Sequence, residues 1–224
     1  MNKLSIVATP IGNLEDITLR ALRTLKECDV IYAEDTRVIS KLLARYEIKK
    51  PLQRLDAATE IKKADEICAR LEAGEKVVFV SDAGTPGISD PGARLVAQVR
   101  ARLPDAAIEA IPGPSALAAA LSIAGMDIAE FTFLGFLPHK KGRQTALKKV
   151  AASDIPVVLY ESPHRIVKLL TELGEASPAS RVVIARELTK VHEEVISGAP
   201  HEVLGHFTAH PDTVRGEFVV IVAP

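Results

Sequence analysis

Short apolar runs rich in β-branched residues alternate with longer amphipathic stretches along the whole sequence. This alternation restricts the fold more than any other feature, because strands that alternate with helices form βαβ units and mostly parallel sheets. The expected strands are Leu4–Ala8, Val30–Ala33, Val77–Val80, Ala107–Ile111, Phe131–Phe136, Val157–Tyr160, Val182–Ala185 and Phe218–Val222. The expected helices are Leu14–Glu27, Thr36–Tyr46, Ile61–Ala73, Gly92–Arg102, Ser115–Ala124, Gly142–Ala152, His164–Leu173 and Glu202–Ala209. The sequence therefore predicts an α/β fold.

A stiff Pro112-Gly113-Pro114 segment interrupts this pattern near the midpoint of the chain. A length of 224 residues suits one large domain or two small ones, since domains usually contain about 100–200 residues. Eight strands could form one sheet, but the break favours two α/β domains: residues 1–113 with a mostly parallel sheet, and residues 114–224 with a mixed sheet. In the second domain, Glu193–Ser197 and Phe218–Val222 look like an antiparallel pair that closes the sheet.

Composition excludes several classes of protein. A chain that is 47% hydrophobic and 25% charged is neither disordered nor collagenous, and no apolar run reaches the ~18 residues that span a bilayer. The start shows no secretory leader, so we expect a cytoplasmic protein, with Cys28 and Cys68 as buried thiols and no metal site. Because the formal net charge is only −1, any contact with a polyanion requires a local basic patch.

The segments that follow the expected strands are unusually rich in glycine, proline and charge. Ligands of open α/β sheets bind at the carboxyl ends of the strands. The most informative segment is residues 81–92, with three glycines and two prolines, because a bare backbone lets a ligand approach closely. Its glycine spacing fits neither a dinucleotide fingerprint nor a P-loop. A tight turn with Asp90 as N-cap and Pro91 as the first helical residue accounts only for its end, so we interpret Ser81–Ile88 as functional.

Other charged residues allow two interpretations each. The basic group Lys140, Lys141 and Arg143, followed by two more lysines, is either a phosphate contact or a solvated helix start. His164 either caps a helix or contacts a substrate. The charges that follow the second strand, from Glu34 to Arg37, either pair with one another or serve a site.

Motifs spread over nearly the whole chain resemble the tetrapyrrole (corrin/porphyrin) methylase superfamily. They are Val7–Leu14, Glu34–Arg37, Val80–Gly92, Pro112–Pro114, Gly135–Pro138, Tyr160–Arg165, Ala185–Lys190 and Gly216-Glu217. Within the superfamily, the chain is similar to the branch that methylates the ribose 2′-hydroxyl of a cytidine in small-subunit (16S) ribosomal RNA. One departure concerns Leu55–Glu60, where only Glu60 remains of a motif that usually also contains histidine and asparagine.

The resemblance implies that S-adenosylmethionine lies in a cleft between the two domains and is held largely by backbone groups. The implied cofactor contacts are Pro10, Asp82, Ala83, Gly84, Ile88, Ser115, Ala116, Leu137, Leu188 and Gly216. The implied substrate contacts are Arg37, Lys140, Lys141, Arg143, His164 and Arg165. The implied partners are small-subunit ribosomal RNA, free or in the 30S particle, and a second copy of the chain in a homodimer.

Methyl transfer from a sulfonium needs alignment and a group that takes the proton of the hydroxyl. The strand ends offer four carboxylates and one lysine for this catalytic role, namely Glu34, Asp35, Glu161, Glu187 and Lys190. Lys190 ranks first, because we expect Arg186, Glu187 and Glu161 around it to tune its pKa. Two alternatives remain open: a methylase of a corrin or porphyrin precursor with the same fold and cofactor, and a non-catalytic module that binds RNA or a nucleotide.

Overall fold

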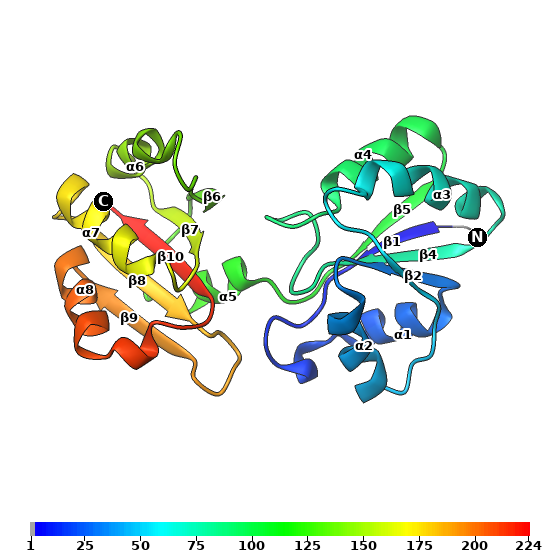
Figure 1. The fold of residues 1–224 in the computed structure, drawn as a ribbon, viewed down its shortest axis with the longest axis horizontal. Coiled ribbons are helices and arrows are strands. Elements are labelled where there is room, and N and C mark those ends of the chain that lie inside the picture. The colour runs from blue at the N-terminus through cyan, green and yellow to red at the C-terminus, as the bar shows by residue number, and fades with distance from the viewer. Residues whose placement is uncertain (1–2) are drawn as a thin grey trace. The chain divides into compact units, whose positions relative to one another are not determined.

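The computed structural model describes residues 3–224, and the chain divides into two compact units after Ser115. The boundary predicted from the sequence, after residue 113, lies two residues earlier. Each unit contains one five-stranded sheet with helices packed against it, as Figure 1 shows.

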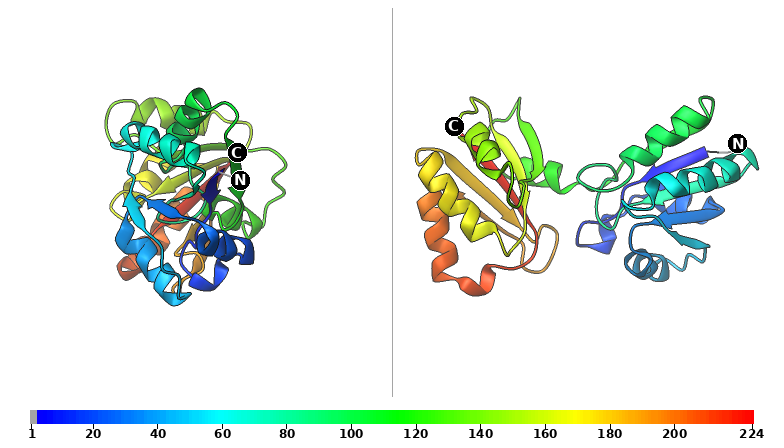
Figure 2. Two further views of the ribbon diagram at one scale, coloured as in Figure 1. Left: turned by 90° about the vertical axis from the view of Figure 1, so that its right-hand side faces the viewer. Right: turned by 45° about the horizontal axis from the view of Figure 1, so that its top comes forward.

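The first unit is built on a fully parallel sheet in the order β3-β2-β4-β1-β5. Its strands are β1 (Lys3–Val7), β2 (Val30–Ala33), β3 (Leu52–Arg54), β4 (Lys76–Val80) and β5 (Ala107–Ile111). Its helices are η1 (Leu14–Asp16), α1 (Leu19–Glu27), α2 (Thr36–Arg45), α3 (Glu60–Glu72) and α4 (Ala93–Arg102). Helices α1 and α2 lie on one face, and α3 and α4 on the other (Figure 2), so each face has its own hydrophobic core.

Three details of the first unit differ from the sequence prediction. Strand β3 was not predicted, because Leu52–Arg54 is a short, half-exposed edge strand with no apolar run. The helix predicted from Leu14 is two elements, and α1 begins only after Thr18, whose hydroxyl caps it by accepting a hydrogen bond from Ala21 N at 3.1 Å. Helix α4 begins at Ala93 with Gly92 at the N-cap, so the predicted cap at Asp90 is wrong.

The second unit has a mixed sheet in the order β6-β7-β10-β8-β9. Its strands are β6 (Thr132–Phe136), β7 (Val157–Glu161), β8 (Arg181–Arg186), β9 (Glu194–Gly198) and β10 (Phe218–Ala223). Its helices are α5 (Ala116–Ser122), α6 (Arg143–Ala151), α7 (Ile166–Ala176), α8 (Pro200–Ala209) and η2 (Pro211–Thr213). Strands β6 and β7 are parallel, and β10 runs antiparallel to both of its neighbours.

The predicted pairing of Glu193–Ser197 with Phe218–Val222 is wrong, although both segments are strands. Strand β9 pairs with β8, whereas β10 lies between β7 and β8. The short connection between β8 and β9 lets them form an antiparallel hairpin at the sheet edge. The almost wholly buried apolar run of β10 instead needs a neighbouring strand on each side.

Both cysteines, Cys28 and Cys68, are buried free thiols, as the sequence analysis expected. Burial raises the pKa of the Cys28 thiol to about 11, which keeps it protonated at neutral pH. Within residues 3–224, no helix combines the length and the apolar character needed to cross a membrane.

Candidate functional site

The carboxyl ends of four strands in the first unit are joined by hydrogen bonds. Thr9, just after β1, forms a two-way backbone pair with Gly84: Thr9 N donates to Gly84 O at 2.9 Å, and Gly84 N donates to Thr9 O at 3.0 Å. Thr85 Oγ1 donates to Pro114 O after β5 at 3.1 Å. Asp82 Oδ1 accepts a hydrogen bond from Asp35 N after β2 at 2.8 Å. The loop that follows β4 is therefore anchored to its neighbours on both sides.

Gly84 lies where these segments approach most closely. Its φ is +78°, and a Cβ built there would lie 3.3 Å from Ile11 Cγ2 and 3.6 Å from Pro114 O. Side chains rarely adopt this dihedral and have little space here, so the position favours glycine. Pro10 is buried beside it, while Asp82, Ala83 and Ile88 are half-exposed. The structure thus brings five of the predicted cofactor residues to one edge of this sheet.

Two carboxylates that follow β2 differ in their electrostatics. Asp35 caps α2 and pairs with Arg37, whose hydrogen bonds to the carboxylate lower the pKa of Asp35 to about 2. Partial burial raises the pKa of Glu34, and the negative charges of Asp82 and Asp56 raise it further. Of the predicted catalytic carboxylates in this unit, Glu34 is therefore the one that takes up a proton more readily.

A second cluster lies at the carboxyl end of β8. Lys190 Nζ contacts Glu187 Oε1 at 2.8 Å and Glu217 Oε2 at 2.9 Å. Burial alone would lower the pKa of Lys190, but its hydrogen bonds to these two carboxylates outweigh burial and raise it. Burial alone would raise the pKa of Glu187, but the hydrogen bonds that it accepts from Lys190 and from the Glu217 amide outweigh burial and lower it. Lys190, Glu187 and Glu217 thus form a charged cluster, in which the lysine is protonated.

The predicted neighbours of Lys190 are partly wrong. Arg186 is directed to Glu194, with Nε 2.7 Å from Oε2, and Glu161 is held by two other arginines. The partner that the sequence analysis missed is Glu217, although its neighbour Gly216 was singled out. A Cβ built on Gly216 would overlap the Glu187 carboxylate, so the absence of a side chain at this glycine leaves room for the charged cluster.

Arg143 does not belong to an exposed basic patch. Its side chain is only 4% exposed, and its Nη2 lies 2.7 Å from Glu172 Oε2. Its Nη1 lies 3.7 Å from Glu161 Oε2, and Glu161 Oε1 also accepts a hydrogen bond from Arg165 Nε at 2.6 Å. Arg143 is therefore not exposed for the predicted phosphate contact, because Glu172 and the buried Glu161 hold its guanidinium inside the second unit.

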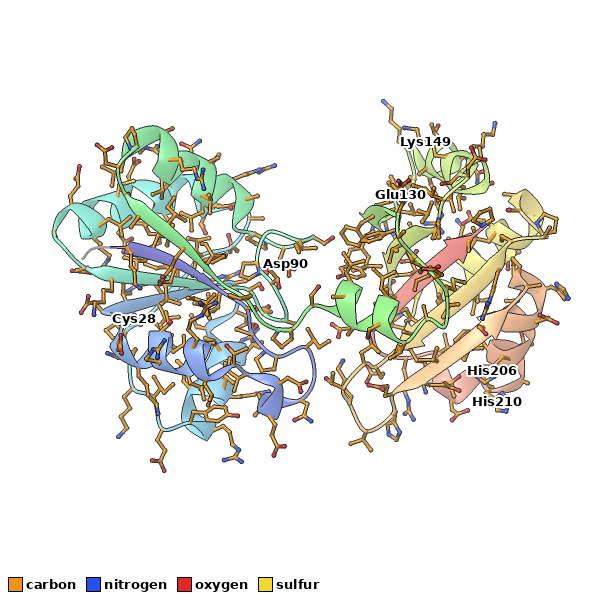
Figure 3. The ribbon with its side chains drawn as sticks, turned by 180° about the vertical axis from the view of Figure 1, so that it is seen from behind. Cys28, Asp90, Glu130, Lys149, His206 and His210 are labelled. Atoms are coloured by element: carbon orange, nitrogen blue, oxygen red, sulfur yellow. The ribbon has the colours of Figure 1, made fainter. Side chains whose placement is uncertain are left out.

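The remaining cations of the patch are on the surface. Lys140 and Lys141 are exposed before α6, and Lys149 extends into solvent farther along that helix (Figure 3). His164 is exposed, and the Arg37 side chain in the first unit is 88% exposed. Arg165, by contrast, is mostly buried and donates to Leu137 O at 3.0 Å, so it holds neighbouring loops together.

The second unit places its own predicted cofactor residues at one sheet edge. Leu137 follows β6 and Leu188 follows β8, and both are buried; Gly216 precedes the antiparallel β10. Ser115 and Ala116 are half-buried at the junction of the units. In the described part of the chain, no three histidine, cysteine, aspartate or glutamate side chains are grouped so as to hold a metal ion.

Comparison with known families decides the classification. The family of Tetrapyrrole (Corrin/Porphyrin) Methylases matches residues 3–203. The chain belongs to this family. Proteins with solved structures share its fold: the methyltransferase CobJ has a TM-score of 0.72 at 20% identity, covering 100% of this chain and 94% of that one. Diphthine synthase has a TM-score of 0.73 at 14% identity, covering 98% of this chain and 89% of that one. The predicted α/β fold and the family resemblance are confirmed.

Curated relatives are more similar in sequence. The ribosomal RNA small subunit methyltransferase I of Coprothermobacter proteolyticus is 45% identical, over 98% of this chain and 96% of that protein. The protein of the same name from Thermotoga maritima is 44% identical, over 100% and 99%. A uroporphyrin-III C-methyl transferase from Thermus thermophilus, whose structure contains S-adenyl homocysteine, has a TM-score of 0.63 at 21% identity, covering 99% and 97%.

Proposed function

We propose that this tetrapyrrole methylase family member is an S-adenosylmethionine-dependent enzyme that methylates the ribose 2′-hydroxyl of a cytidine in 16S ribosomal RNA. The observation that carries the proposal is the 44–45% identity, over practically the whole chain, to proteins named ribosomal RNA small subunit methyltransferase I. The alternative, a corrin or porphyrin precursor as substrate, relies on neighbours of about 20% identity, and these support the fold alone.

The described residues fit the cofactor. Gly84 has a φ that side chains rarely adopt and little space for a Cβ, so the main chain is bare at this point of the loop. We propose that Pro10, Asp82, Ala83, Gly84 and Ile88 hold the cofactor from the first unit. We propose Leu137, Leu188 and Gly216 of the second unit, together with Ser115 and Ala116, as further cofactor contacts. When bound, S-adenosylmethionine supplies an electrophilic methyl group, so the chain has to supply alignment and a proton acceptor.

Glu34 is the proton acceptor that the electrostatics favour. The substrate hydroxyl must lose its proton, and a carboxylate with a raised pKa takes that proton better than an ordinary one. Asp35 is engaged by Arg37, and Lys190 is protonated. Glu161 is enclosed by Arg143 and Arg165. Glu34 therefore replaces Lys190 as the first candidate for the base.

We place the RNA contact at exposed cations on both units: Arg37, Lys140, Lys141 and His164. A chain with a net charge of −1 offers little basic surface for a large RNA, so we propose that it acts in the cytoplasm as a homodimer, on RNA or on the 30S particle. Sedimentation at micromolar concentration tests the dimer. A mass near 24 kDa, with full activity at the same concentration, would remove it from the mechanism.

The decisive experiment compares ribosomal RNA from a deletion strain with RNA from the same strain complemented by the chain. Ribonuclease digests analysed by mass spectrometry should lack one ribose methyl in the deletion strain and regain it on complementation. A 2′-O-methyl also makes the adjacent linkage resistant to alkali, which separates ribose from base methylation. An unchanged digest, together with methyl transfer to uroporphyrinogen III by the purified chain, would favour the alternative substrate.

A further inference from the structure

A buried carboxylate, Glu60, connects two helices on one face of the first sheet. Glu60 is only 2% exposed and is the first residue of α3. Its Oε1 accepts a hydrogen bond from Gly92 N at 2.8 Å and another from Leu95 N at 2.9 Å. Both donors belong to the start of α4, which packs beside α3 in Figures 1 and 2.

Helix α4 cannot cap itself. Its N-cap is Gly92, which has no side chain, and its φ of +129° belongs to glycine. An ordinary N-cap side chain accepts from the third helical residue, and in a capping box that residue's own side chain accepts from the N-cap amide. Glu60 receives both of these hydrogen bonds on one oxygen, from Leu95 N and Gly92 N, although it is remote in sequence. The start of α4 therefore depends on α3.

The same contact fixes the far end of the loop that follows β4. Gly92 is the last residue of this loop, which also contains Asp90 (Figure 3). Gly87 N donates to Pro91 O at 3.0 Å, so the loop folds back on the segment that Glu60 holds. A Cβ at Gly92 would lie 2.9 Å from Phe79 Cε1 and 3.3 Å from Gly87 N, so this end is tightly packed. The near end is tied separately, through the pair between Thr9 and Gly84.

We propose that Glu60 is a positioning residue for the cofactor: it holds the loop of residues 81–92 in its binding conformation from outside the site. The inference rests on the proposed function, because it assumes that this loop binds S-adenosylmethionine. A carboxylate suits the task, since it lies at the amino ends of two helices, whose dipoles favour negative charge there. Its burial is compatible with that charge because both hydrogen bonds come from main-chain donors.

The test compares the affinity for S-adenosylmethionine of wild-type protein with that of three variants, by calorimetry, at a temperature where all are folded. Glu60→Ala removes both hydrogen bonds and should weaken binding at least about tenfold, which corresponds to about 1.4 kcal/mol. Glu60→Gln keeps the accepting oxygen and should stay within about threefold of wild type. The control, Asp29→Ala, removes another carboxylate that accepts a main-chain hydrogen bond, from Lys76 N at 2.7 Å, where β4 begins. It should leave the affinity unchanged.

A structural role alone would lower the thermal stability of Glu60→Ala without changing the affinity of the folded protein. The proposal would be overturned if Glu60→Ala bound S-adenosylmethionine with wild-type affinity. It would also be overturned if Glu60→Gln lost as much affinity as Glu60→Ala. If Glu60→Ala does not fold, Glu60→Asp replaces it, because its shorter side chain cannot make both hydrogen bonds together. It should again weaken binding about tenfold. Wild-type protein that binds no S-adenosylmethionine would instead refute the proposed function itself.

Discussion

Thr9 and Gly84 are joined by two backbone hydrogen bonds, although one follows β1 and the other follows β4. This pair is an isolated antiparallel bridge between the segments that leave two adjacent parallel strands. It holds the glycine-rich loop in a backbone conformation that side chains rarely adopt. Because Glu60 holds the other end of the loop, its shape is determined by residues outside it.

Replacement of Gly84 by alanine should damage both stability and cofactor binding. The new Cβ would meet Ile11 Cγ2 at 3.3 Å, at a φ of +78°, so we expect a loss of about 1–3 kcal/mol in the free energy of unfolding. Gly74→Ala is the matched control, because Gly74 also has a positive φ but no atom within 4 Å of the new Cβ. Urea denaturation measures the free energy of unfolding of both variants. Calorimetry with S-adenosylmethionine should show weakened binding only for Gly84→Ala. Equal affinities of the two variants would contradict a role of this loop in binding.

Replacement of Arg143 by alanine should destabilise the second unit strongly. It would leave the mostly buried Glu172 without the cation that lies 2.7 Å from it and would remove a second cation from the buried Glu161, which keeps Arg165. Breaking a buried pair on one side costs about 3–5 kcal/mol. Lys149→Ala on the same helix removes an exposed cation and should change stability by less than about 0.5 kcal/mol. Thermal unfolding of both variants checks the difference, and similar melting temperatures would show that Arg143 is not a structural cation.

The exposed pair Lys140 and Lys141 should determine part of the salt dependence of RNA binding. Their double replacement by alanine removes two surface cations, and each lost phosphate contact should reduce the slope of log K against log salt by about one. Replacement of Lys26 and Lys62, two exposed helical lysines of the first unit, is the control. Filter binding at several salt concentrations measures the slope. If both double variants keep the wild-type slope, Lys140 and Lys141 are only a solvated helix start.

Lys190 should act through its positive charge and not as a base. Its pKa is raised in the folded protein, so the stabilisation by Glu187 and Glu217 is complete below its ordinary pKa and is lost only as pH rises through the folded value. At neutral pH the ammonium is therefore intact. We expect Lys190→Arg to keep kcat within about tenfold of wild type and Lys190→Ala to lose more, because arginine retains the charge but cannot accept a proton near neutral pH. Equal inactivity of both variants would return Lys190 to the list of candidate bases.

Glu34 should set the acidic limb of the pH profile. As its pKa is raised, kcat/KM should rise with pH through a value above that of an ordinary glutamate. Glu34→Gln should abolish this limb and lower kcat by about 10²–10⁴-fold, the usual contribution of a general base. The control is Asp35→Asn, which removes a carboxylate that already titrates at a pKa of about 2 and should leave the limb in place.

The stability of Glu34→Gln provides a second readout. A carboxylate whose pKa is raised on folding reduces stability as pH rises through the interval between its unfolded and folded values. At neutral pH the neutral glutamine should therefore be at least as stable as wild type. A variant that loses activity together with stability would indicate a structural role for Glu34 instead.

Local sequence patterns determined much of this protein. Apolar β-branched runs such as Val77–Val80 are strands because their side chains can be buried on both faces of a sheet, and that property is visible in the run itself. Glycines and prolines restrict the backbone directly, so the functional loop of residues 81–92 was also recognisable. The sheet-end positions of the cofactor candidates follow from this alternation of strands and loops.

Only the tertiary structure decided which side chains meet. Arg143 looked like part of a basic patch, but Glu172, far along the chain, turns it inward. Lys190 likewise pairs with Glu217, which is distant in the sequence. Strand β9 pairs with β8 because a short connection brings the two strands together. A charge does not reveal its partner in local sequence, because burial and electrostatic pairing depend on contacts between distant segments. The sequence by itself therefore determined where the loops lie, and the folded chain decided which of their charges remain free to bind.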